Sequence, residues 1–224
     1  MFRSYRAFVS EFYKVAIWII YPMIACFGCI IVQNGCFGLL KRSGYHYMAV
    51  QGLLCSGIVF VECVADYWLF SGIQSKSVNH MEFLKGSGKG KLFFKNAILS
   101  DIMRRAIVIL ICNGFNLAIG ILTFKENLSD LGGIELVILY SICCYFFSTL
   151  GVFISRFGDI WWFNMSIGYI GSFIFPVLLY FISALESLLW IWIIVFLVFS
   201  VVISITIERV AIKKVEDSYY DERS

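Results

Sequence analysis

Two acidic residues, Glu62 and Asp66, lie four positions apart in a long apolar stretch, so a helix would place both carboxylates on one face. Arg104 and Arg105 directly precede the next long apolar stretch. If the two stretches form antiparallel neighbouring helices, these opposite charges meet near one end of the pair. We expect structural ion pairs among the four residues, because pairing lowers the cost of a carboxylate in apolar surroundings. The functional alternative is a proton or cation relay through Glu62 and Asp66.

Four uncharged polar residues also interrupt apolar stretches: Gln51, Asn113, Asn116 and Asn164. Each side chain either hydrogen-bonds to a neighbouring helix or faces a cavity that receives a substrate. The 22 Phe, 12 Tyr and 6 Trp residues could line such a cavity for an apolar or amphipathic molecule. We therefore treat these four residues as a possible substrate cavity.

Metal and redox chemistry are not expected. Most of the cysteines fall in apolar stretches, where small buried thiols pack between helices. Cys26 and Cys29 have the spacing of a redox pair, but the sequence offers no second pair and no nearby His. His46 and His80 lie near opposite ends of one apolar stretch, so they do not suit a shared metal. We expect no metal site and no catalytic residues.

The run from Gly86 to Leu92, Gly-Ser-Gly-Lys-Gly-Lys-Leu, superficially resembles a phosphate-binding loop. It has three residues rather than four between Gly86 and Gly90, and Leu92 stands where Ser or Thr would reach a magnesium ion. We expect this chain to bind no ATP and no other cofactor. Any ATP-driven work would need a separate subunit.

The elements that must position these residues are predicted to be membrane helices. With 60% hydrophobic residues among 224, the chain has too little polar surface for a soluble fold. We predict an all-α integral membrane protein with six spans, since a span needs about 20 apolar residues. The first four spans cover about 15–32, 45–73, 106–124 and 134–155. The fifth ends near Ser183 after an inner turn at 156–159, and the sixth begins at Trp190.

The distribution of Lys and Arg residues along the chain predicts how this bundle is oriented in the membrane. Three of the 18 Lys and Arg residues lie in predicted outer segments, namely Lys41, Arg42 and Lys125, and all the others lie in segments that would share the inner side. Both ends are therefore predicted to be cytoplasmic. Residues 1–14 have aromatic residues at helical spacing, which predicts an interfacial amphipathic helix; the alternative is a positive flank that only orients the first span. Residues 15–214 form the transmembrane domain, and 215–224 are expected to be a disordered polar tail.

The longest inner connection, residues 74–105, mixes seven basic residues with Met, Leu and Phe. A short helix over Asn79, His80, Met81, Glu82, Phe83, Leu84 and Lys85 could end at Gly86, and a second helical stretch from Leu92 would run into the third span. Exposed aromatic residues in a basic loop suit docking into a groove of a partner protein. The alternative is a positive loop whose Phe side chains rest on lipid headgroups.

This layout of an amphipathic entry helix, six spans and a long second-to-third connection resembles the membrane subunits of ABC-2-type (type V) ABC exporters. The stretch from Met81 to Lys91, continuing to Arg105, is similar to that connection in small peptide exporters, and the chain most resembles permeases for phenol-soluble-modulin toxins. One departure is the short segment of about 184–189 between the fifth and sixth spans, where many members have a re-entrant helical pair.

The resemblance implies a permease in the bacterial cytoplasmic membrane. Two copies of the chain would pair with two ATPase subunits, which would bind ATP and magnesium, and residues 79–85 would couple ATP hydrolysis to the spans. The substrate would be an amphipathic or hydrophobic peptide of toxin or antimicrobial type, and lipid, not nucleic acid, would surround the complex. The alternative is an ion-coupled secondary transporter or channel that uses Glu62 and Asp66.

Overall fold

The computed structural model describes residues 4, 15, 18–24, 54–62, 88–124, 133–157, 166, 170, 174 and 189–220. Apart from a turn at 88–89, all of these residues are helical. The expected all-α fold is therefore confirmed for this part of the chain. Three long helices dominate it: α5 (Gly90–Phe124), α6 (Gly133–Phe157) and α8 (Leu189–Tyr220).

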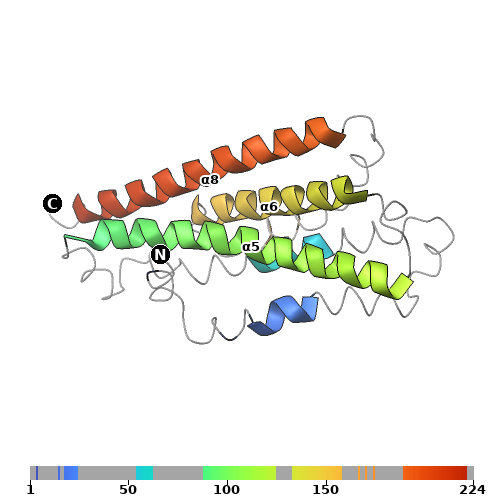
Figure 1. Ribbon diagram of the computed structural model, residues 1–224. Coiled ribbons are helices and arrows are strands. Elements are labelled where there is room, and N and C mark those ends of the chain that lie inside the picture. The colour runs from blue at the N-terminus through green and yellow to red at the C-terminus, as the bar shows by residue number, and fades with distance from the viewer. Residues whose placement is uncertain are drawn as a thin grey trace.

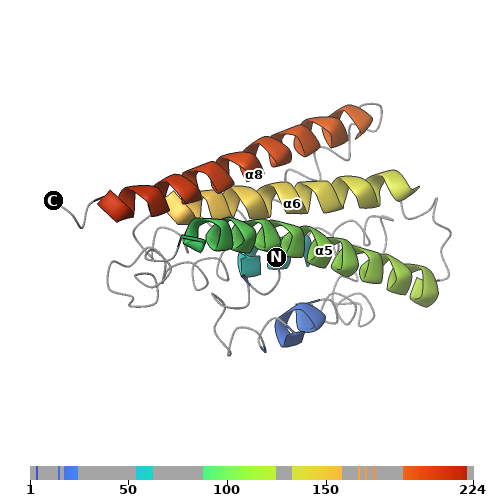
Figure 2. The same ribbon diagram turned by 60° about the vertical axis from the view of Figure 1, so that its left-hand side comes forward.

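The three long helices form a layered bundle in which α6 lies between α5 and α8 (Figures 1 and 2). The closest packing is that of α6 against α8. The helical segment 18–24 lies on the opposite side of α5 from α8, and segment 54–62 packs on α5 and α6. The beginning of α5 and the ends of α6 and α8 lie at the same end of the bundle, which is the end predicted to face the cytoplasm.

The predicted helical stretch from Leu92 into the third span is present as part of one unbroken helix. α5 has 35 residues, so its axis is about 52 Å long, well beyond the thickness of a hydrocarbon core. It begins after the turn at Gly88 and Lys89, where the Phe93 amide donates a 3.0 Å hydrogen bond to the Lys89 carbonyl. The part of the predicted inner connection from Gly90 onward and the predicted third span therefore belong to one continuous helix.

Two expected boundaries near the inner end are wrong. α6 continues through Arg156 and Phe157, which were expected to begin a tight turn. α8 continues to Tyr220, so residues 215–220 are helical and not disordered as expected from their polarity. An established helix extends through polar residues at little cost, because each added residue gains a backbone hydrogen bond without new nucleation. α8 thus projects beyond its apolar part.

One helix in the described residues has both the length and the composition of a membrane span. Leu189–Val210 has 22 residues and a mean hydropathy of 2.7, and only 17% of its apolar window is buried. These residues rise about 33 Å, which matches a hydrocarbon core of about 30 Å. The apolar part of α6, Val137–Val152, is shorter. The described part of the chain thus supports one span and does not by itself support the six-span layout expected from the sequence.

The other predicted spans are described only in part. In the first, residue 15 and the 18–24 segment are helical, and the helix passes through Pro22 as expected for a span that tolerates proline. In the second, the described residues are 54–62, and in the fifth they are Ser166, Ile170 and Ile174. All are helical. The remainder of these spans lies outside the described residues.

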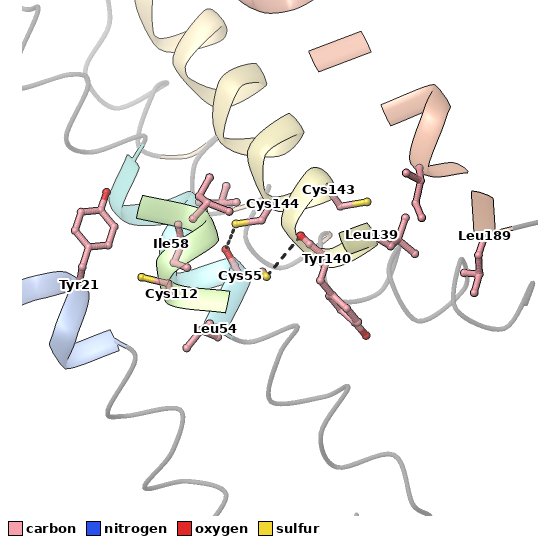
Figure 3. Close-up of a cluster of buried hydrophobic side chains, with 13 residues drawn as sticks. Tyr21, Leu54, Cys55, Ile58, Cys112, Leu139, Tyr140, Cys143, Cys144 and Leu189 are labelled. Atoms are coloured by element: carbon pink, nitrogen blue, oxygen red, sulfur yellow. Dashed lines mark hydrogen bonds between the residues drawn. The ribbon is translucent and has the colours of Figure 1, made fainter. Parts of the chain in front are cut away.

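The core joins the 18–24 and 54–62 segments to α5, α6 and α8 and consists mostly of Cys, Leu, Ile and Val side chains (Figure 3). Ile58 and Val59 of the 54–62 segment pack with Ile109 of α5 and Leu139 of α6, and all four side chains are at most 2% exposed. Cys55, Cys112, Cys143 and Cys144 are free thiols in this core. They occupy the helix contacts where the sequence predicts packing cysteines.

Aromatic rings and internal hydrogen bonds complete the contact between α6 and α8. The ring of Phe146 meets that of Phe196 edge-on, with centroids 5.2 Å apart. Buried hydroxyl groups bond to their own helices, as in Ser200 Oγ to the Phe196 carbonyl at 2.6 Å and Thr149 Oγ1 to the Tyr145 carbonyl at 2.8 Å. Such bonds satisfy polar groups where no water is present.

The exposed apolar face of α8 predicts that a charged substitution there disfavours membrane insertion. Val198 lies near the middle of the apolar span and is 52% exposed. Val198→Arg should disfavour membrane insertion by about 2.5–3.5 kcal/mol, whereas Val198→Leu should have no such effect. The measurement is the membrane-inserted fraction of each variant after expression. A soluble, monodisperse Val198→Arg protein would contradict the assignment of this helix as a membrane span.

Candidate functional site

The candidate site is a buried charge cluster that consists of Tyr21, Glu62, Asp101, Arg104 and Arg105. Its α5 members follow an i, i+3, i+4 spacing, which places Asp101 on the same helix face as both arginines. Arg104 Nη2 lies 3.0 Å from Asp101 Oδ1, and Arg105 Nη2 lies 2.7 Å from Asp101 Oδ2. One carboxylate therefore holds both guanidinium groups on their own helix.

Glu62, which belongs to the neighbouring 54–62 segment, accepts hydrogen bonds from the same two arginines. Arg104 binds it through two parallel hydrogen bonds, Nη1 to Oε1 at 2.9 Å and Nη2 to Oε2 at 2.7 Å. Arg105 Nε donates to Oε2 at 3.1 Å. The planar fork of arginine suits this two-point contact with a carboxylate, which fixes the relative rotation of the two helices as well as their charge balance.

Tyr21 extends the cluster to the 18–24 segment. Its hydroxyl donates a hydrogen bond to Glu62 Oε1, and Arg104 Nη1 lies 3.4 Å from the same hydroxyl oxygen. Tyr21 is 5% exposed and belongs to the apolar core through its ring. The side chains of three helical segments, from the first, second and third predicted spans, therefore converge on one carboxylate.

Burial makes this charge balance a strict requirement. Glu62 and Asp101 are fully buried, Arg105 is 1% exposed, and the Arg104 side chain is 11% exposed. Among the described residues, the two carboxylates and two guanidinium groups of the cluster sum to zero net charge. An isolated charge at such a position costs several kcal/mol in desolvation, whereas paired and hydrogen-bonded charges recover part of that cost. The geometry suits a structural ion network, because both oxygens of Glu62 already accept hydrogen bonds from charged donors.

A second polar contact links α5 to α6 and to the 54–62 segment. Asn113 Nδ2 donates to Ser141 Oγ at 3.1 Å, and that hydroxyl donates in turn to the Val137 carbonyl at 2.9 Å. The Cys55 thiol lies 3.7 Å from Asn113 Oδ1. The Cys144 thiol lies 3.7 Å from the Cys55 carbonyl, a contact drawn as a dashed line in Figure 3. Asn113 is 1% exposed, so this candidate cavity residue serves helix contact.

Several predicted site residues lie outside the described residues. They are the coupling residues 79–85, the carboxylate Asp66, and the possible cavity residues Gln51 and Asn164. Asn116 belongs to α5, but its side chain is not among those described. Of the predicted ion-pair residues, the structure brings together Glu62, Arg104 and Arg105.

Sequence reasoning missed Asp101 and Tyr21. The signal for Asp101 was present, because an acid three and four positions before two arginines pairs with them on any helix that includes residue 101. The third span was predicted to begin at Ala106, so the spacing of Asp101 to Arg104 and Arg105 was not applied as evidence for ion pairs. Tyr21 carries no local signal, since its hydroxyl meets Glu62 only through the packing of two segments far apart in the sequence.

Cofactor and metal sites were also considered for the described residues. No group of three or more His, Cys, Asp or Glu side chains within them has the geometry to hold a metal ion. Lys89, in the loop that resembles a phosphate-binding loop, is exposed in the turn before α5. No protein-family model, curated protein or solved structure matches the chain. The site is therefore interpreted from its geometry and charge.

Removal of the Glu62 charge should destabilise the bundle. Glu62→Gln leaves two buried guanidinium groups with one carboxylate, which should lower the unfolding free energy by about 3–5 kcal/mol. Thermal unfolding in detergent micelles measures this change. The control is Glu208→Gln at the partly exposed Lys95–Glu208 pair, which should cost less than about 1 kcal/mol.

A double variant that exchanges the charges of Glu62 and an arginine distinguishes stabilisation by ion pairing from stabilisation by packing alone. Glu62→Arg combined with Arg104→Glu restores a net charge of zero and should recover part of the stability lost in either single variant. The same exchange can be made with Arg105. If neither exchange recovers any stability, pairing is not what holds these residues together.

The Asn113–Ser141 bond should have a small but measurable coupling. In a double-mutant cycle with Asn113→Ala and Ser141→Ala, the coupling energy should be about 0.6 kcal/mol, the average for such contacts between membrane helices. Thermal unfolding of the four proteins gives the value. Additive effects of the two substitutions would mean that the contact contributes nothing beyond packing.

Proposed function

We propose that this chain is the six-span permease subunit of an ABC-2-type exporter that moves amphipathic or hydrophobic peptides across the bacterial cytoplasmic membrane. Two copies would assemble with two ATPase subunits, which hydrolyse ATP. The chain would have no ATPase site of its own. The proposal rests on the layout of the sequence, on the apolar surface of the described helices and above all on the construction of α5.

The observation that carries the proposal is the continuity of α5. A transporter driven by a separate ATPase needs a stiff element that reaches from the cytoplasm into the bundle, because a flexible linker would absorb the displacement. α5 has that form, since it extends unbroken from Gly90 in the inner connection to Phe124. At Arg104 and Arg105 it is bonded to Glu62, and at Arg104 also to Tyr21, so movement of its inner end would move two more spans.

A second link supports the same interpretation. Lys95 of α5 lies 3.2 Å from Glu208 of α8, near the inner end of the apolar span. This pair is about 14 Å along α5 from Arg104. α5 therefore contacts α8 at one level and the first two predicted spans at another, as expected of a central element in ATP-driven rearrangement.

The ion-coupled alternative fits the geometry less well. A relay carboxylate must release and accept protons or cations, whereas Glu62 is fully buried and binds two guanidinium groups and a hydroxyl. An ion would have to displace an arginine to reach it. Asp66 lies outside the described residues, so the case for this alternative is confined to the sequence.

Coupling to an ATPase can be tested directly. The chain is expressed with an ABC ATPase subunit from its own organism, and ATP-driven uptake of a fluorescent amphipathic helical peptide is measured in inside-out vesicles. Phe83→Ala combined with Leu84→Ala should abolish both ATPase co-purification and uptake, because the two side chains would fill the docking groove. The matched control is Phe115→Ala, which alters an exposed side chain on the apolar face of α5.

Two outcomes would overturn the proposal. In one, the ATPase co-purifies equally well with the Phe83→Ala, Leu84→Ala variant and uptake continues. In the other, uptake persists after ATP is depleted and stops when the ion gradient is dissipated, which would favour the ion-coupled alternative.

A further inference from the structure

One stripe of exposed residues along α8 is apolar over most of its length and cationic at its end. Five exposed apolar residues follow one another at intervals of three or four positions, which keeps them on one side of the helix. They are 45–59% exposed: Ile191, Ile194, Val198, Val202 and Ile205. The same spacing continues to Arg209 and Lys213, which are also exposed. The stripe is thus apolar over most of its length and cationic at its inner end.

The change from apolar to cationic residues coincides with the end of the membrane span. The span ends at Val210, one residue after Arg209. Lys213 lies about 6 Å further along the axis, and Ile205 lies about 6 Å before Arg209. The guanidinium and ammonium groups therefore reach the depth of the phospholipid phosphates when Val202 and Ile205 face acyl chains.

Among the described side chains, no acidic group pairs with either of these two cations. Glu208, the acidic neighbour of Arg209, is paired with Lys95 of α5 at 3.2 Å. Within the described part of the chain, no hydrogen bond or ion pair engages Arg209 or Lys213. Lys89, in the turn before α5, is an exposed cation on the same end of the bundle. Among the side chains that the structure describes, the inner end of the α5–α8 pair therefore has an excess of positive charge, because Lys89, Arg209 and Lys213 add to the Lys95–Glu208 pair.

The lysines of α5 are not explained by helix stability. Lys89, Lys91 and Lys95 lie at or near the N-terminus of α5. Positive charges at a helix N-terminus oppose the helix dipole, so they weaken the helix slightly. Their position is instead favourable for attraction of an anion at the membrane surface, where each Lys or Arg adds to the electrostatic binding of acidic lipids.

We infer that the inner end of α8 is a binding site for an anionic phospholipid of the inner leaflet. Arg209 and Lys213 bind its phosphate, and an acyl chain lies along Ile205, Val202 and Val198. The positive charge of Lys89, which is exposed at the same end of the bundle, favours a lipid with net negative charge over a zwitterionic one. The inference rests on the membrane insertion of α8 within the proposed function and does not involve the ATPase. An amphiphile is the occupant because apolar and cationic residues share one continuous stripe.

The test measures lipid binding to the purified full chain without its ATPase. The protein in detergent is titrated with phosphatidylglycerol or phosphatidylcholine, and bound lipid is counted by native mass spectrometry. Phosphatidylglycerol should bind more tightly, and its affinity should fall as salt concentration rises. Arg209→Gln combined with Lys213→Gln should weaken phosphatidylglycerol binding roughly 10- to 30-fold, since each cation at a membrane surface contributes on the order of 1 kcal/mol.

Two variants serve as controls. Lys41→Gln combined with Arg42→Gln removes the same two residue types from a predicted outer segment and should leave phosphatidylglycerol affinity unchanged. Arg209→Lys combined with Lys213→Arg conserves the charge and should retain most of the affinity. Should the Gln variant fail to fold, the wild-type comparison of the two lipids and the charge-conserving variant still decide the question.

Three results would overturn the inference. The first is equal affinity of the wild-type protein for the two lipids. The second is equal loss of binding in the inner and outer double variants. The third is displacement of phosphatidylglycerol by an equal concentration of glycerol 3-phosphate, which would indicate a site for a soluble phosphate compound. Because the ATPase is absent, none of these results depends on whether the chain is an exporter.

Discussion

Four charges buried in apolar surroundings determine how the described helices fit together. Glu62 can occupy the core only while Arg104 and Arg105 lie within hydrogen-bond distance, and both arginines are held in place by Asp101. Each charge removed from this neutral group leaves another without compensation, at a cost of several kcal/mol. The hydrophobic effect between helices is weak when the alternative solvent is lipid, so packing and polar contacts of this kind give the bundle its specificity. The cluster fixes the rotation and the axial position of segment 54–62 relative to α5.

The rest of the described bundle is arranged around that contact. One turn before Glu62, Ile58 and Val59 pack against α5 and α6, and Cys55 joins the Asn113–Ser141 contact. α8 lies across α6 through the aromatic rings of Phe146 and Phe196 and meets α5 at the Lys95–Glu208 pair. Glu62, Asp101 and Asn113 thus have partners inside the described bundle, and the outer faces of α5 and α8 carry many exposed apolar side chains. This distribution of polar and apolar groups agrees with the proposed location of the bundle in a bilayer.

Both proposals follow from this distribution of polar groups. A stiff α5 that carries the cluster and extends toward the cytoplasm suits a membrane subunit moved by an external motor. The exposed stripe of α8, apolar through the span and cationic at Arg209 and Lys213, suits a surface in contact with the inner leaflet. In an exporter the two features would act together, because a lipid bound at the end of α8 lies beside the Lys95–Glu208 contact and so beside the element that moves.

The sequence by itself determined the helical character of the described part of the chain, the approximate extent of α5, α6 and α8, and the kind of partner that Glu62 would need. These properties depend on hydropathy and charge along the chain, which are local. Only the tertiary structure decided that Glu62 binds both arginines, that Tyr21 joins them and that Asn113 bonds to Ser141. Those contacts join residues far apart in the sequence, and they depend on the rotation and axial shift of one helix against another. A change of one residue in that register turns a side chain by about 100° and would remove the contact, so no local pattern encodes it.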